Sequence, residues 1–162
     1  DNTLYDWVGS FVPSFYAMVE AASTLLGVDK ERLLTELKSV HQRYHNTEQP
    51  FALLETPSVR AAFPSLMQLE VVEQLAPAFA AFDRTRAELL TAYPGVHSTL
   101  EHIRSSGCPI VAHTEATMKN VVHRLGTLGL DRYFGEVWAP ETLGPAHPVA
   151  NGESRTIRND EY

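Results

Sequence analysis

The run CPIVAHT, residues Cys108–Thr114, decides the fold class of this chain. It is apolar and too short for a helix, which predicts a buried strand. Apolar residues recur at helical spacing before it, over residues 97–106, and after it, over residues 118–128, and a second strand candidate follows at residues 136–139. Strands that alternate with helices predict a parallel sheet of the doubly wound, Rossmann-like α/β class.

Residues 10–92 have a different character, because their apolar positions follow helical spacing and no strand is predicted among them. The helices expected here cover residues 10–26, 30–45 and most of 66–92. Asp29 is placed as the N-cap of the second helix, and Pro13 is tolerable if it lies in the first turn of the first helix. Pro77 must start, kink or divide the last segment, and the proline-rich residues 46–64 predict short turns.

The two ends of the sequence lack regular patterns. No strand or initiator Met precedes the polar turn at Asp1, and the residues from Pro140 to Tyr162 are rich in Gly, Pro and polar side chains. This tail is predicted to be a loop, with Asp160 and Glu161 solvated. A loop beside an incomplete sheet leads us to expect a chain truncated at both ends.

Composition limits the classes of partner. The chain has 13 Lys and Arg against 20 Asp and Glu, and its net charge of −7 argues against a broad surface for nucleic acid or anionic lipid. No run approaches the ~20 apolar residues needed to cross a bilayer. The single Cys108 cannot form an internal disulfide, which favours a reducing cytoplasm. We therefore expect no nucleic acid and no membrane as partners, and the oligomeric state stays open.

Two short motifs resemble those of the haloacid dehalogenase superfamily. Asp1, Asn2 and Thr3 match the third to fifth positions of its first motif, Asp-x-Asp-x-Thr. Residues 110–114 match its second motif, a Thr or Ser at the end of an apolar strand, and residues 125–137 resemble the segment that leads to the next strand. Each motif is weak alone, but their order and spacing make the combination specific.

The resemblance implies an architecture and an activity. Residues 1–9 and 93–162 would form a partial α/β core, and residues 10–92 a helical cap inserted after the first motif. The implied activity is Mg²⁺-dependent hydrolysis of a small phosphorylated metabolite through an aspartyl-phosphate. Dehalogenation is disfavoured, because it requires neither a metal nor an acid at the position of Asp1.

The resemblance also assigns roles to individual residues. Asp1 would be the general acid and base and would offer its backbone carbonyl to Mg²⁺, and Thr114 would donate to a phosphoryl oxygen. Substrate contacts are implied for Thr3, Tyr5, His113 and Glu115. The nucleophilic Asp would lie two positions before Asp1, and the third-motif Lys and fourth-motif acids beyond Tyr162, so the chain alone is expected to be inactive.

Other interpretations stay open. The protein could be a non-catalytic or degenerate binding relative, and the Asp1–Thr3 segment and Thr114 could serve only as turn or helix caps. His41 and His45 have the spacing of a zinc pair, but no third ligand accompanies them, so surface positions are favoured. Cys108 is interpreted as a small buried hydrophobe rather than a nucleophile.

Overall fold

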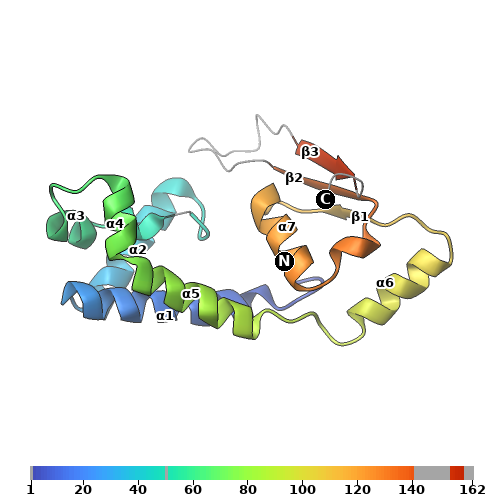
Figure 1. Cartoon of the computed structure of the whole chain (residues 1–162), viewed down its shortest axis with the longest axis horizontal. Coiled ribbons are helices and arrows are strands. Elements are labelled where there is room, and N and C mark those ends of the chain that lie inside the picture. The colour runs from blue at the N-terminus through green and yellow to red at the C-terminus, as the bar shows by residue number, and fades with distance from the viewer. Residues whose placement is uncertain (1, 50, 141–153, 159–162) are drawn as a thin grey trace. The chain divides into compact units, whose positions relative to one another are not determined.

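A computed structural model describes residues 2–49, 51–140 and, for the strand backbone, 154–158 (Figure 1). The chain divides into two compact units. The first, called the α/β unit, comprises Asp1–Trp7 and Leu90–Tyr162, and the second, called the helical unit, comprises Val8–Leu89. The assignment of the helical unit as a cap stays a prediction.

The regular elements of the helical unit are helices in the part of the chain that the structure describes. These are α1 (Trp7–Leu26), α2 (Lys30–Tyr44), the 3-10 helix η1 (Ala52–Glu55), α3 (Pro57–Ala62), α4 (Gln68–Gln74) and α5 (Ala76–Leu89). As predicted, Asp29 caps α2, and its carboxylate accepts a hydrogen bond of 3.0 Å from the Arg32 amide. Leu33, Leu37 and Leu75 are fully buried in the core of this unit.

The first helix starts earlier than predicted. It begins at Trp7 rather than residue 10, because the Asn2 side-chain oxygen accepts a 2.9 Å hydrogen bond from the Trp7 amide. Pro13 therefore lies inside the helix and not in its first turn. The helix ends at Gly27 as predicted, where a φ of +64° is accessible to a residue without Cβ.

The proline-rich segments follow the expected pattern. Residues 46–64 hold only the short η1 and α3, and Pro77 lies in the first turn of α5, where a helix does not need its amide. Thr56 caps α3 through a hydrogen bond from the Val59 amide. Among the described residues, no single helix is long and apolar enough to cross a membrane, and α1 and α2 pass that test only as a pair bent by 119°.

The α/β unit contains a small sheet covered by a helix. Its elements are α6 (Val96–Ser105), β1 (Val111–His113), α7 (Met118–Thr127), the 3-10 helix η2 (Asp131–Tyr133), β2 (Glu136–Pro140) and β3 (Ser154–Arg158). The strand order is β1-β2-β3, with β1 and β2 parallel and Ala112 opposite Val137 (Figure 1). A parallel pair joined by a helix confirms the α/β class.

The buried strand predicted at residues 108–114 is shorter and more exposed than expected. β1 begins at Val111, which is 52% exposed, and Cys108 is also exposed. The buried face of the sheet carries Val137 and Ala139, which pack against α7 residues in one core cluster. None of residues 108–114 is fully buried, and Ile110, Ala112 and Thr114 are half-buried, so the prediction of a buried strand is wrong for this run.

The predicted loop from Pro140 to Tyr162 contains a strand. β3 pairs antiparallel with β2, and Val137 lies opposite Ile157. Its five residues show no clear alternation, so the pattern gave no strand signal, whereas the free edge of β2 offers backbone groups to pair with. Asp160 and Glu161 lie outside the described residues.

The chain leaves and re-enters the α/β unit at one place. Tyr5 forms an isolated antiparallel bridge with Ala92, and the Tyr93 amide donates a 2.9 Å hydrogen bond to the Leu4 carbonyl. Leu4 and Ala92 both pack against the core cluster of the α/β unit. The segment after the first motif is therefore fixed to the returning chain.

Candidate functional site

The first-motif segment is a tight turn that leads directly into α1. Asn2 has φ +56°, in the left-handed region where Asn is favoured among residues that carry a Cβ. With its side chain bonded to the Trp7 amide, Asn2 both turns the chain and caps the helix. Thr3 is exposed beside it, and Asp1, the predicted acid, base and metal ligand, lies outside the described residues.

Thr114 directly follows β1. Its amide donates a 3.0 Å hydrogen bond to the Trp138 carbonyl, which continues the pairing of β1 with β2. Its hydroxyl oxygen accepts a 3.2 Å hydrogen bond from the Ala116 amide, as in a Ser/Thr turn. The amide is thus used within the sheet, but a hydroxyl that accepts one bond keeps its own hydrogen for donation.

The alternative role of Thr114 as the cap of α7 needs correction. The N-cap of α7 is Thr117, which forms no side-chain capping bond. Thr114 instead stabilises the turn between β1 and α7. This local role is compatible with donation to a ligand, because the two interactions use different parts of the hydroxyl group.

The predicted substrate contacts differ in accessibility. His113 and Glu115, on either side of Thr114, are exposed, and His113 lies opposite Trp138 in the sheet. Tyr5 is only 6% exposed, and its hydroxyl accepts a 3.3 Å hydrogen bond from Nη1 of Arg124. Contact with substrate stays a prediction for Tyr5 and for Thr3, His113 and Glu115.

The two motif segments converge on one hydrophobic core. Leu4, next to Thr3, packs against the same cluster as Ala112 and Ala116, which flank Thr114. The bond between Tyr5 and Arg124 joins residues that are 119 positions apart in the sequence. The described segments of both motifs therefore belong to the same unit.

Arg124 is a residue that the sequence interpretation missed. It lies on α7 beside the core residues Val121 and Leu125 and is itself only 6% exposed. Charged side chains are rarely buried unless they are paired. The sequence held a weak signal for burial, because Arg124 follows Val121 by three residues and directly precedes Leu125. In sequence alone, however, an arginine at this position resembles the boundary of an apolar face.

The described residues do not build a metal site by themselves. They contain no group of three or more His, Cys, Asp or Glu side chains that could hold a metal ion. His41 is half-buried against the Phe15 ring, and burial lowers its pKa. His45 is the left-handed residue after α2, so it does not extend a helical pair with His41.

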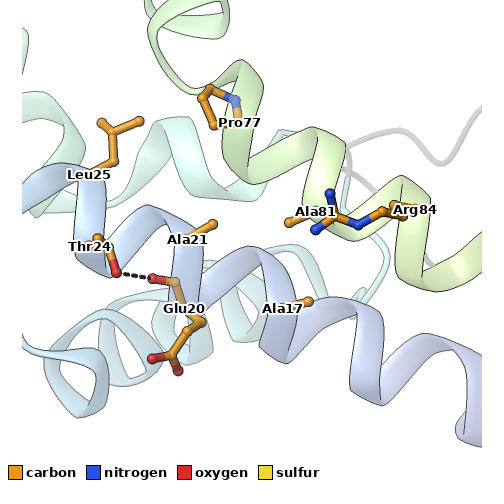
Figure 2. A pocket seen from close by; sticks show the side chains of 8 residues that line it. All are labelled: Ala17, Glu20, Ala21, Thr24, Leu25, Pro77, Ala81 and Arg84. Atoms are coloured by element: carbon orange, nitrogen blue, oxygen red, sulfur yellow. Dashed lines mark hydrogen bonds between the residues drawn. The ribbon is translucent and has the colours of Figure 1, made fainter.

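A shallow groove occurs in the helical unit. It lies between α1 and α5 and has a volume of about 540 Å³ (Figure 2). Its small side chains are Ala17, Ala21 and Ala81, and its charged ones are Glu20 and Arg84. None of these residues was predicted as part of a site, and Glu20 is already paired with Lys30 at 2.5 Å.

A comparison with solved structures finds a chain of similar fold. The protein is similar to a solved structure described as "putative beta-phosphoglucomutase from Thermotoga maritima", with a TM-score of 0.52 and 20% sequence identity. The similarity covers 87% of this chain and 58% of that one, so the chain spans little more than half the length of this neighbour. No protein-family model and no curated protein matches the sequence.

Proposed function

We propose that the gene product is a phosphohydrolase that transfers the phosphoryl group of a small phosphorylated metabolite to water. The observation that carries this proposal is the convergence of two motif segments in the α/β unit. The turn at Asn2 and Thr3 and the strand-end Thr114 flank residues of one core cluster. Hydroxyl and backbone donors at strand ends and helix starts suit the oxygens of a phosphate.

The proposed reaction has two steps. A carboxylate two positions before Asp1 attacks phosphorus, the bond from phosphorus to the ester oxygen breaks, and Asp1 gives its proton to the leaving alkoxide. Water then attacks the aspartyl-phosphate, Asp1 takes the proton of that water, and inorganic phosphate leaves. Thr114 donates its hydroxyl hydrogen to a phosphoryl oxygen in both steps.

Mg²⁺ and substrate enter the proposal through the family resemblance. The described side chains supply no complete ligand set for the ion. Contacts of Thr3, Tyr5, His113 and Glu115 with the substrate belong to the same proposal. A cytoplasmic location and partners limited to a small phosphorylated substrate also stay predictions from the sequence.

The test is hydrolysis of a panel of phosphate monoesters by the complete gene product with Mg²⁺. We expect release of inorganic phosphate that stops with EDTA, returns with added Mg²⁺, and falls at least ~100-fold in Asp1→Asn, the scale at which general acid–base catalysis contributes. A folded protein that binds phosphate esters without hydrolysing any would favour the non-catalytic alternative. Full turnover in Asp1→Asn would remove Asp1 from the mechanism.

A further inference from the structure

We propose that Arg124 is a positioning residue that holds the first-motif segment against α7 through the hydroxyl of Tyr5. The inference rests on the proposed function for its catalytic consequence. Tyr5 and Arg124 both belong to the α/β unit. The bond runs from Nη1 of Arg124 to the Tyr5 oxygen over 3.3 Å, and both residues are 6% exposed.

Because Arg124 is buried, its hydrogen bonds must have defined directions. A guanidinium removed from water loses hydration that an apolar residue would not lose, so it must be compensated by hydrogen bonds in defined directions. Here the side chain lies on α7 among apolar core residues, where a Leu or Met would pack without that requirement. The hydrogen bond from Arg124 therefore holds the hydroxyl end of the Tyr5 ring, in addition to the packing that holds the ring itself.

The two ends of the bond lie on the segments that follow the two motifs. Tyr5 lies two residues after Thr3, and its backbone is fixed by the bridge to Ala92. Arg124 lies on the helix that begins at Met118, shortly after Thr114. Because a helix is rigid over this length, the bond sets the first-motif segment in register with the turn at Thr114. A displacement of about 1 Å between reacting groups can cost ~100-fold in rate.

The decisive variant is Tyr5→Phe, which removes one oxygen atom and leaves the ring. A matched control exists in the same unit, where the hydroxyl of the buried Tyr133 accepts a 2.8 Å hydrogen bond from Nη2 of Arg132. Tyr133→Phe therefore also removes a hydroxyl bonded to an arginine, but from η2 and not from a motif segment. A general loss of stability would appear in both variants.

Two measurements on the complete gene product separate positioning from stability. Amide hydrogen exchange of residues 3–6 is expected to quicken in Tyr5→Phe and stay unchanged in Tyr133→Phe. With a phosphate monoester and Mg²⁺, kcat is expected to fall at least ~10-fold in Tyr5→Phe with little change in KM, because misplaced groups affect the transition state most. In Tyr133→Phe both constants should stay at the wild-type values.

A double variant tests the coupling. If Arg124 acts through Tyr5, kcat of Tyr5→Phe/Arg124→Met should be no lower than that of Arg124→Met alone. Equal exchange at residues 3–6 in the two Phe variants would overturn the proposal, as would equal kcat in an active enzyme. A wild-type protein without any hydrolase activity would refute the proposed function, and the exchange comparison would still decide the positioning role.

Discussion

At the scale of single residues, Thr114 joins a structural and a proposed catalytic role in one hydroxyl group. Its oxygen accepts from the Ala116 amide, and its hydrogen is the part proposed to donate to phosphate. These roles can be separated by substitution. Serine keeps both the acceptor and the donor, whereas valine keeps the shape and removes both.

We predict that Thr114→Val lowers kcat/KM for the best phosphate ester by about 100-fold, the scale of losing one donor to a transition-state oxygen. Thr114→Ser should stay close to the wild type. The control is Thr127→Val at the end of α7, since Thr127 is exposed and its hydroxyl donates to the His123 carbonyl of the same helix. Steady-state kinetics decide the point, and equal values for both valine variants would exclude Thr114 from the site.

At the level of residues, the structure supports the alternative interpretation of the motif segments as turns. Asn2 and Thr114 both lie at turns that suit their side chains, and the proposed phosphate contact of Thr114 stays a prediction. Arg124 was not predicted, because Tyr5, to which it donates a hydrogen bond, is 119 positions away in the chain. A buried polar pair of this kind depends on tertiary contact, which periodicity cannot express.

At the scale of elements, α3 depends on a carboxylate from another helix. Glu36 of α2 accepts hydrogen bonds from the Ser58 amide at 2.9 Å and the Ser58 hydroxyl at 2.8 Å. Burial acts to raise the pKa of Glu36, but these bonds and the pairing with Arg32 outweigh it and hold the pKa below the usual 4.5. The ionised carboxylate thus stabilises the start of α3.

A pKa that is lower in the folded protein gives stability that is complete above 4.5 and is lost as the pH falls through the folded value. We predict that Glu36→Gln lowers the free energy of unfolding by about 1–2 kcal/mol at neutral pH, the scale of hydrogen bonds to a charged group. The difference from wild type should shrink as the pH falls below 4.5 and the carboxylate takes up a proton. Urea unfolding at several pH values measures this difference in the free energy of unfolding. Glu88→Gln, at an exposed position, is the control. A difference that does not change with pH would contradict a role for the charge of Glu36.

Some boundaries of helices and strands can be predicted from the local sequence alone. Asp29 and Pro77 mark helix starts by chemistry that operates within one turn, and both predictions are confirmed. The start of α1 and the strand β3 were missed, because the first depends on a side chain from the preceding motif and the second on the edge of β2. Pairing with a distant partner leaves no periodic signal when the strand is short.

At the scale of the whole molecule, the α/β class was predicted from alternating elements and is confirmed by the parallel pairing of β1 with β2. The similarity in fold to a solved neighbour is consistent with this class. At 20% identity, a similar fold does not identify the substrate of this protein. The proposed chemistry therefore rests on the roles proposed for Asp1 and Thr114, and not on this neighbour.

The most direct test of the central claim is a crystal structure of the complete gene product with Mg²⁺ and orthovanadate, a mimic of the phosphoryl group in transfer. We predict vanadate in the α/β unit, with one oxygen within a hydrogen-bond distance of about 2.7–3.0 Å of the Thr114 hydroxyl and near the backbone of Asn2 and Thr3. Vanadate bound elsewhere, with the Thr114 hydroxyl bonded only within its own turn, would contradict the account.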